Sequence, residues 1–506
     1  MKIKLVKGNT QEEIEARTRL VATAGQISHS SKEIFDLYNE RIDYEDNLKA
    51  IGRIVGSGHT SITEHDQLTF FITNVTPVIE QMLIGQRLVS FTIKSRRYVD
   101  FSNSGFYVPN FNYLKNGQSI EIKYQEHMKY LFNIYSKMCE QGIPKEDARF
   151  ILPYCFYSQI SMSLNTRSLI NLIEYCLISN MSQIREVKEF GLKMLEIAKE
   201  KVPYYKKKYL EFDKIIKENI SFKDSLSFLD KYNTEKYVVL NRPSLISVQT
   251  DYDEYPLSKI DRTIIVSYIM NRYQLDFEKA DNFYERLNED EKAKIMDIIC
   301  MAKQSRELEQ VSFKFQLPTS LAGLTHLTRH RMHSLLIPDF LPMYNLNNYI
   351  IPDTIKDNCM DLYMDAVSEN MKIYEELKQM GVEEKDLVYF NLSGTMINIS
   401  TNINGRELLL MSRLRCCNRA QWEVRYLLNN MVEQIQSESF LYGNYLGAPC
   451  AIKGKCPEGK HSCGKPYIYQ KKDVRQLVYN GVLYEIISCH VVNKMSKNVY
   501  YWLYLF

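Results

Sequence analysis

The chain has 506 residues, of which 45% are hydrophobic and 25% charged, and its formal net charge is only +3. This composition is typical of an ordinary globular protein of two to four domains, and the small net charge argues against nucleic acid as a partner. It contains no run of 18 apolar residues, and its 11 cysteines are scattered and odd in number, so we expect a cytoplasmic protein that does not span a membrane.

The first two hundred residues alternate between helical and strand patterns. Strand composition marks residues 1–6, 67–73 (QLTFFIT) and 158–164. Helical spacing of apolar residues marks 11–22, 31–53, 77–89 and 120–141, and further helices run to Lys201, before Val202-Pro203.

About 240 residues later the same order of elements returns. Thr63-Glu64-His65 precedes the strand QLTFF as Leu308-Glu309-Gln310 precedes VSFKF, an offset of 245. The helix that Pro77 opens ends at Gly85-Gln86-Arg87, as one opened by Pro318 ends at Arg329-His330-Arg331, and these ends differ by 244. Asn404-Gly405-Arg406 follows Asn165-Thr166-Arg167 by 239. The sequence therefore predicts two diverged tandem copies of one α+β domain, an antiparallel sheet with helices.

The copies set the predicted domain boundaries. The first copy is predicted over 1–212, a charged helical linker over 213–235, and the second copy over 236–447. VVL at 238–240 is its predicted first strand, and helices follow over 258–301. Residues 448–506 form a C-terminal extension that contains clustered cysteines.

The basic triplet Arg329-His330-Arg331 is the most informative short stretch. Such side chains are not buried unless something anionic neutralises them, so the triplet is well placed to hold a phosphate or an electron-rich ring. The alternative is a basic helix end that pairs with the helix dipole and nearby carboxylates.

The two copies together complete a longer pattern. In the first copy, Arg87 is followed after seven residues by Ser95-Arg96-Arg97-Tyr98. Combined with the triplet, this spells Arg-His-Arg, seven residues, Ser, any residue, Arg-Tyr, which resembles the signature of the flavin-dependent thymidylate synthases. Gly58-His59-x-Ser61-x-x-Glu64-His65 and Ala420-Gln421-Trp422-Glu423-Val424-Arg425 extend the resemblance, which covers about 50–205 and 300–440.

The resemblance implies a function. It implies methylation of dUMP to dTMP, with FAD as cofactor, NADPH as reductant and methylenetetrahydrofolate as one-carbon donor. It also implies active sites built by several subunits, so a chain of two copies is expected to form a homodimer that imitates a tetramer. Two alternatives stay open: one-carbon transfer to carbon 5 of another pyrimidine nucleotide, for example hydroxymethylation, and a non-catalytic nucleotide- or flavin-binding paralogue.

The resemblance also assigns residues. The implied FAD-binding residues are His59, Ser61, Glu64, Asn165, Arg167, Asn171, Arg329, His330, Arg331, Asn404 and Arg406. The implied dUMP-binding residues are Arg87, Ser95, Arg97, Arg149 and Arg329. Arg415 is the implied catalytic residue, because an arginine beside the pyrimidine carbonyl would stabilise the charge that develops in the reaction.

Neither copy has the whole set. The first copy has Gly85 and Gln86 in the triplet positions and Cys176 in place of the activating arginine. In the second copy the changed positions are Asp339, Leu341 and Val388. Because the losses are complementary, we expect sites assembled from both copies. Two local alternatives remain: Asn165 and Asn404 are also good N-caps, and Arg406 and Arg415 lie on opposite faces of a straight helix.

The C-terminal extension contains Cys450, Cys456, His461 and Cys463 within a Gly-, Pro- and Lys-rich stretch. Thiolates and an imidazole suit Zn²⁺, so these four residues are candidate zinc ligands. The spacing is not that of common zinc modules, and an iron–sulfur cluster or free thiols are the alternatives. After Lys465 the alternation of aromatic and aliphatic residues predicts strands.

Overall fold

The computed structural model describes residues 1–218, 239–252, 259–338, 346–465, 475–479 and 482–486. The chain forms two compact units, and each is discontinuous in sequence. The first unit comprises Met1–Val239, Ser320–Arg329 and Pro338–Ile397, and the second comprises Leu240–Thr319, His330–Ile337 and Asn398–Phe506. The first unit therefore contains parts of both predicted copies, and the predicted boundaries at 212 and 236 stay predictions.

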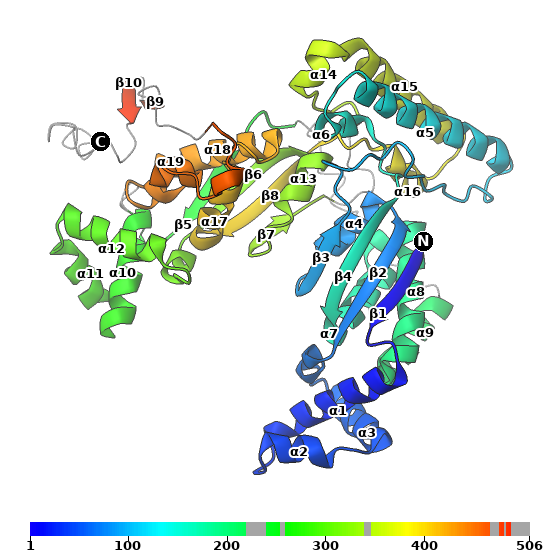
Figure 1. Ribbon diagram of the computed structural model, residues 1–506, viewed down its shortest axis with the longest axis horizontal. Coiled ribbons are helices and arrows are strands. Elements are labelled where there is room, and N and C mark those ends of the chain that lie inside the picture. The colour runs from blue at the N-terminus through cyan, green and yellow to red at the C-terminus, as the bar shows by residue number, and fades with distance from the viewer. Residues whose placement is uncertain (219–238, 253–258, 339–345, 466–474, 480–481, 487–506) are drawn as a thin grey trace, which may run out of the picture. The chain divides into compact units, whose positions relative to one another are not determined.

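The first unit contains a four-stranded antiparallel sheet (Figure 1). Its strands in chain order are β1 (Lys2–Lys7), β2 (Gln67–Val75), β3 (Val89–Ile93) and β4 (Ser158–Asn165). Their order across the sheet is β1-β2-β4-β3, with β1 at one edge. Leu68, Phe70 and Ile72 of β2 are buried while Phe71 between them is 54% exposed, which is the period-two pattern that the sequence predicts.

The second sheet repeats this order. Its strands are β5 (Ser244–Gln249), β6 (Ser312–Ser320), β7 (His333–Leu336) and β8 (Met396–Asn404), arranged β5-β6-β8-β7. Two sheets with the same strand order confirm the predicted α+β fold built from two copies. Of the predicted first strand VVL, Val238 lies outside the described residues and Val239 and Leu240 are not in a strand; the first described strand of this copy begins at Ser244.

Helices cover the first sheet and extend beyond one end of it (Figure 1). The helices of the first copy are α1 (Gln11–Ile27), α2 (Ile34–Glu40), α3 (Tyr44–Gly56), α4 (Pro77–Ile84), α7 (Thr166–Ile178), α8 (Arg185–Lys201) and α9 (Lys206–Lys217). The start of α1 is fixed by a capping box between Thr10 and Glu13. The helix α7 packs against both β4 and α8, which buries Leu169, Leu172 and Ile173.

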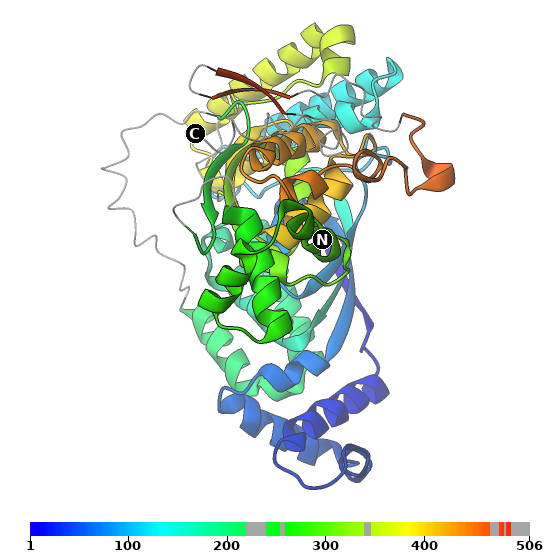
Figure 2. The same ribbon diagram turned by 90° about the vertical axis from the view of Figure 1, so that its left-hand side faces the viewer.

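A long helix from each copy completes the first unit. The helices α5 (Gly117–Glu140) and α15 (Met360–Gln379) pack side by side (Figures 1 and 2). Four short helices accompany them: α6 (Lys145–Ala148), α13 (Leu321–Leu327), α14 (Asp353–Asn358) and α16 (Glu384–Leu387). The long helices expose polar side chains and bury apolar ones, such as Tyr124 and Tyr363, as amphipathic spacing predicts.

In the second unit, two groups of helices accompany the sheet. They are α10 (Lys259–Tyr273), α11 (Phe277–Glu285) and α12 (Glu289–Met301), and then α17 (Gly405–Arg415), α18 (Trp422–Gln436) and α19 (Pro449–Lys453). The strands β9 (Arg475–Tyr479) and β10 (Val482–Ile486) pair with each other, as the alternating tail predicts. Among the described residues, no helix is both long and apolar enough to cross a lipid bilayer.

Three predicted helices differ from the structure. The segment 31–53 is two helices, because Arg41 leaves the helical conformation and Asp43 then caps α3. The helix predicted over 77–89 ends at Ile84, and the edge strand β3 follows. Pro318 lies in β6, and the helix after it begins at Leu321 with Ser320 as N-cap.

A buried carboxylate in the first unit joins residues of the two copies. Glu186 of α8 is 1% exposed and accepts hydrogen bonds from the backbone N–H of Thr76 at 3.0 Å and from its hydroxyl at 2.6 Å. The hydroxyl of Tyr389, from the second copy, donates to the same carboxylate at 3.2 Å. Burial raises the pKa of Glu186 from 4.5 to about 7, against the effect of these donors.

This shift predicts a pH-dependent stability. The folded protein keeps the Glu186 proton up to about pH 7, whereas the unfolded chain loses it near pH 4.5, so stability falls as pH rises across that window. Glu186→Gln cannot ionise and should flatten the change in thermal midpoint between pH 4.5 and 7. Glu196→Gln, at an exposed position of the same helix and outside the charges that act on Glu186, is the control and should leave the pH dependence unchanged. Equal profiles for both variants would contradict the assignment.

Candidate functional site

The helix α4 and the turn after β3 carry the two partners of a buried ion pair in the first unit. Arg96, in the turn after β3, donates from Nη2 to Glu80 Oε2 at 2.7 Å, and Glu80 belongs to α4. Both side chains are buried, at 7% and 1% exposure. The other carboxylate oxygen of Glu80 has no hydrogen-bond partner in the described structure. This carboxylate therefore has capacity left for another cation.

Glu146 holds two further arginines, one through its carboxylate and one through its backbone carbonyl. Arg97 donates from Nε to Glu146 Oε2 at 2.5 Å, and Arg149 Nε donates to the Glu146 carbonyl oxygen at 3.0 Å. Ser95 shapes the turn, because its hydroxyl accepts the Arg97 N–H and its carbonyl accepts the Val99 N–H. Arg149 is 2% exposed. Ser95, Arg97 and Arg149, all predicted to bind the nucleotide, thus come together.

Residues of the second copy join the same place. His326 of α13 is buried, and its Nε2 lies 3.4 Å from Nη2 of Arg149. Arg329 lies just beyond the end of α13. Arg329 is exposed, but nearby protein atoms partly desolvate its guanidinium and lower its pKa, and the neighbouring Arg96 and Arg97 lower it further while Glu80 opposes them. No carboxylate within the described ranges forms an ion pair with Arg329.

We call the set Arg96, Arg97, Arg149, Arg329, Glu80, Glu146 and His326 the arginine cluster. Counted over these seven named residues alone, four guanidinium groups stand against two carboxylates, an excess of two positive charges with His326 counted as neutral. Concentrated like charges raise the free energy of the folded state unless an anion neutralises them. The arginine cluster therefore has the charge and the donor geometry to bind a dianionic phosphate.

A second group of predicted residues lies at the start of α7. Arg167, in the first turn, donates from Nη1 to Glu64 Oε1 at 2.5 Å. Glu64 belongs to the 3-10 helix η1 (Ser61–His65), so Ser61 is part of the same element, and His59 is exposed just before it. Asn171 is exposed on the Arg167 side of α7, one turn further on. Asn165 caps α7 by accepting the N–H of Ser168 at 2.8 Å.

The second copy repeats this arrangement at the start of α17. Arg406 Nη1 donates to Glu309 Oε1 at 2.6 Å, and Glu309 belongs to the 3-10 helix η6 (Glu307–Gln310). Asn404 caps α17 by accepting the N–H of Glu407 at 2.9 Å. The N-cap alternative is therefore realised for both asparagines. A flavin role for the five residues Asn165, Arg167, Asn404, Arg406 and Glu64 stays a prediction.

In the second unit a buried histidine bonds Arg415, and a buried glutamate bonds that histidine in turn. Its Nε donates to Nε2 of His330 at 2.9 Å, and Nδ1 of His330 lies 3.1 Å from Oε1 of Glu407. His330 and Glu407 are each 6% exposed. Arg406 and Arg415, at opposite ends of α17, therefore have different partners, as their spacing predicts.

The first copy has a core residue where the second has Arg415. Cys176 is 0% exposed, its Sγ lies 3.4 Å from Sδ of Met82, and burial raises the pKa of its thiol. Gly191 packs so closely that an added Cβ would lie 2.5 Å from the Cβ of Cys176. An arginine cannot fit in this space without moving α8.

Five further positions of the signature complete the comparison of the two copies. Arg87 and Arg331, equivalent positions in the two copies, are exposed before β3 and β7. Val388 is buried in the 3-10 helix η7 (Val388–Phe390), where the first copy has Arg149. Asp339 and Leu341 lie outside the described residues.

The predicted zinc ligands do not form a site. Cys450 is buried in α19, His461 is exposed, and Cys463 Sγ interacts with the Lys465 carbonyl and the Asn418 side chain. Nowhere in the described ranges do three or more His, Cys, Asp or Glu side chains gather as a metal site. The zinc prediction for Cys450, Cys456, His461 and Cys463 finds no support.

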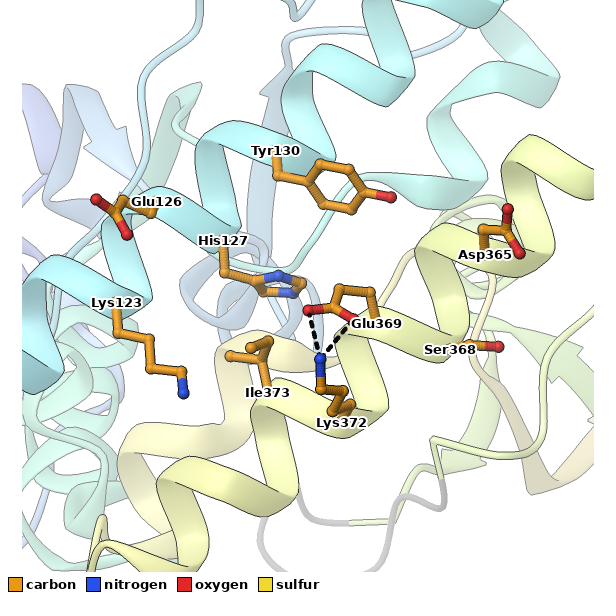
Figure 3. A pocket seen from close by; sticks show the side chains of 9 residues that line it. All are labelled: Lys123, Glu126, His127, Tyr130, Asp365, Ser368, Glu369, Lys372 and Ile373. Atoms are coloured by element: carbon orange, nitrogen blue, oxygen red, sulfur yellow. Dashed lines mark hydrogen bonds and ion pairs between the residues drawn. The ribbon is translucent and has the colours of Figure 1, made fainter.

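A groove of about 720 Å³ between α5 and α15 contains none of the predicted site residues (Figure 3). His127 at its base bonds Asn370 Oδ1 at 2.9 Å and stacks on Phe390, and Lys372 pairs with Glu369. Because these polar groups have partners, the groove is not the candidate site. Its lining residues are Lys123, Glu126, His127, Tyr130, Asp365, Ser368, Glu369, Lys372 and Ile373.

The sequence analysis did not identify the acidic partners of the site. Glu146 and Glu407 each hold an arginine or histidine of the predicted set, and His326 contacts Arg149. Glu80 holds Arg96, which the sequence analysis did not predict either. A signal existed for Glu407, since the equivalent first-copy residue is Ser168, and a change from hydroxyl to carboxylate in an otherwise similar stretch is informative.

Comparisons with known proteins agree with the repeated architecture. The sequence profile of the family described as thymidylate synthase complementing protein matches residues 11–204 and again 257–439. Each matched segment contains three strands of one sheet, and the edge strands β1 and β5 lie just before the two segments.

Each curated relative matches a length of this chain that is similar to the length of one copy. A flavin-dependent thymidylate synthase from Clostridium tetani is 29% identical over 201 residues, covering 35% of this chain and 80% of that protein. One from Sulfolobus acidocaldarius is 30% identical, covering 46% and 86%. One from Pyrococcus abyssi is 33% identical, covering 33% of this chain and 66% of that protein, and for several other relatives this chain also spans less than two thirds of their length.

Among solved structures, the UMP/dUMP methylase PolB from Streptomyces cacaoi, bound with 5-Br dUMP, is 21% identical to this chain. The alignment covers 39% of this chain and 90% of that one, with a TM-score of 0.33. Because this score is low, the fold assignment rests on the family profile and on the two equivalent sheets.

The arginine cluster generates a stability prediction. Glu80→Gln removes the ionised partner of buried Arg96 and should destabilise the first unit by about 3 kcal/mol, because an uncompensated buried charge remains. Glu64→Gln breaks the half-exposed pair with Arg167 and should cost less than about 1 kcal/mol. Urea denaturation followed by circular dichroism measures both. A Glu80→Gln variant as stable as Glu64→Gln would show that Glu80 does not hold the cluster.

Proposed function

This chain belongs to the thymidylate synthase complementing protein family, and on that premise we propose that it methylates carbon 5 of dUMP to give dTMP. The reaction would use methylenetetrahydrofolate as one-carbon donor, a bound FAD and NADPH as reductant. The curated relatives named as flavin-dependent thymidylate synthases support a flavin-dependent transferase.

The observation that carries the proposal is the surplus of two positive charges in the arginine cluster. A nucleoside monophosphate ends in a dianionic phosphate, whose charge matches this surplus. Arg97, Arg149 and Arg329 would donate to its oxygens, and Ser95 would hold the turn that presents Arg97. Because Arg329 comes from the second copy, this phosphate site would need both copies.

The two glutamate–arginine pairs at the helix starts are chemically suited to FAD. Arg167 and Arg406 are 44% and 37% exposed in their side chains, and each lies in the first turn of a helix, where the helix dipole also favours anions. They would hold the flavin pyrophosphate, and exposed His59 would pack against the ring system. When bound, the reduced flavin supplies the hydride that converts the transferred methylene to methyl.

Arg415 would act on the pyrimidine ring. A guanidinium beside a ring carbonyl stabilises the negative charge that develops as carbon 5 attacks the one-carbon unit, and this needs no cysteine nucleophile. The C5 hydrogen then leaves as a proton. Since the first copy has buried Cys176 at the equivalent position, we propose that every working site uses Arg415.

Two measurements on the purified protein, repeated on one variant, test the activity. The purified protein should show the visible absorption of bound flavin, and it should release tritium from [5-³H]dUMP when methylenetetrahydrofolate and NADPH are present. Arg415→Ala should retain flavin but lose tritium release by at least about a hundredfold, because a transition-state contact is removed.

A matched control for Arg415→Ala is Arg413→Ala, two residues earlier, whose side chain bonds the carbonyl of Cys300 instead. It should retain release within about threefold. A protein that cannot be loaded with FAD would overturn the proposal, and flavin-bound protein that is active only on another pyrimidine nucleotide would change the substrate. Full activity of Arg415→Ala would remove its catalytic role.

The homodimer proposal has its own test. If Arg415 and the phosphate site of one working centre come from two chains, an equal mixture of Arg415→Ala and Arg97→Ala chains should recover about a quarter of wild-type activity. Half of the dimers are then mixed, and one of their two centres has both native residues. The chains are mixed in mild urea and refolded together. No recovery, with mixed dimers shown by mass spectrometry, would mean that each centre uses one chain.

A further inference from the structure

We propose that Glu407 is a positioning residue for Arg415 and that it acts through His330. The proposal rests on the proposed function, because it concerns how the arginine that activates the pyrimidine is held. Nothing in the signature residues of the sequence includes Glu407, whose first-copy equivalent is Ser168.

The hydrogen bonds fix the state of the imidazole. An arginine Nε always carries a proton, so Nε2 of His330, 2.9 Å from Arg415 Nε, must accept with its lone pair. In the neutral ring the proton is then on Nδ1, which donates to Glu407 Oε1 at 3.1 Å. The carboxylate thus selects the only neutral tautomer that can accept from Arg415. Without it, the other neutral tautomer, with its proton on Nε2, would place an N–H donor against the N–H of the guanidinium.

The backbone of α17 fixes the position of Glu407 relative to Arg415. Glu407 lies in the first turn of α17, where its N–H is bonded to the N-cap Asn404 at 2.9 Å, and Arg415 is the last residue of the same helix. Eight residues correspond to about 12 Å along a helix axis, so the two side chains meet through His330 rather than directly. His330 and Glu407 are both 6% exposed, which excludes water from competing for these bonds.

The two copies differ at all three positions together. Where the second copy has His330, Glu407 and Arg415, the first has Gln86, Ser168 and Cys176, at offsets of 244, 239 and 239. Gln86 bonds the carbonyl of Met82 instead, and Cys176 is buried. The copy without the arginine also lacks both groups that would hold one. This is expected if Glu407 and His330 serve Arg415, and is not required if they only stabilise the fold.

A fixed guanidinium matters because arginine is flexible. Immobilising such a side chain costs up to about 2 kcal/mol of rotamer entropy, which a preorganised site meets before substrate binds. Fixing the Nε edge sets the plane of the guanidinium and so its approach to the ring carbonyl. Loss of the carboxylate should therefore lower the rate of the chemical step more than the affinity for dUMP.

The test compares Glu407→Gln with wild type in steady-state tritium release from [5-³H]dUMP. We expect kcat to fall by about tenfold to a hundredfold, the range typical of groups that orient a functional residue, while KM for dUMP and flavin content stay within about twofold. Glu407→Ser, which copies the first-copy residue, should behave alike and serves if the amide variant folds poorly. Ser168→Ala, at the equivalent first-copy position, is the matched control and should keep wild-type kcat.

A second background separates positioning from a structural role. In Arg415→Lys, which keeps a cation but lacks the Nε group that His330 holds, adding Glu407→Gln should change kcat by less than about twofold. Equal losses in both backgrounds, or a kcat unchanged by Glu407→Gln in the native background, would overturn the proposal. Absence of dUMP turnover in the wild-type protein would instead overturn the proposed function, so the two failures are distinguishable.

Discussion

The structure depends on holding four arginines together in the first unit, and this is possible because two carboxylates neutralise half of their charge. Glu80 and Glu146 come from segments on either side of the turn that carries Arg96 and Arg97. Arg329 then joins without an ion pair to a carboxylate in the described chain, and its pKa is lowered first by desolvation and then by the neighbouring Arg96 and Arg97. The cluster therefore has an excess of positive charge, which the binding of a phosphate dianion would neutralise.

The residues of the proposed sites are divided between the two copies. The described cations of the arginine cluster come mostly from the first copy, whereas the arrangement around Arg415 comes wholly from the second. The glutamate–arginine pair at the start of α7 and α17 is the feature that both retain. Both copies contain that pair, whereas the other residues of the proposed sites are divided between them. Specialisation of duplicated sites predicts this pattern, and simple decay does not.

The sequence predicted the architecture better than the interactions. Collinear anchors were sufficient for two copies of an α+β domain, because the spacing of apolar residues and caps is local information. The short strand β3 was missed because Val89–Ile93 follows a helix without a strong turn signal, and its pairing depends on contacts with the distant residues 160–164 of β4. Glu80, Glu146 and Glu407 were missed for the same reason. The chain has many carboxylates, and only the fold shows which of them lies beside an arginine or a histidine.

The packing around Cys176 explains why the proposed activating role falls on the second copy. The Cys176 side chain lies against Met82, and Gly191 of α8 is so close that even an added Cβ would meet Cys176. The substitution Cys176→Arg would place a long cation in this buried space, which costs several kcal/mol unless a carboxylate pairs with it. The first copy therefore has no room for an arginine at this position, and the proposal that every working site uses Arg415, held through His330 and Glu407, follows from that constraint.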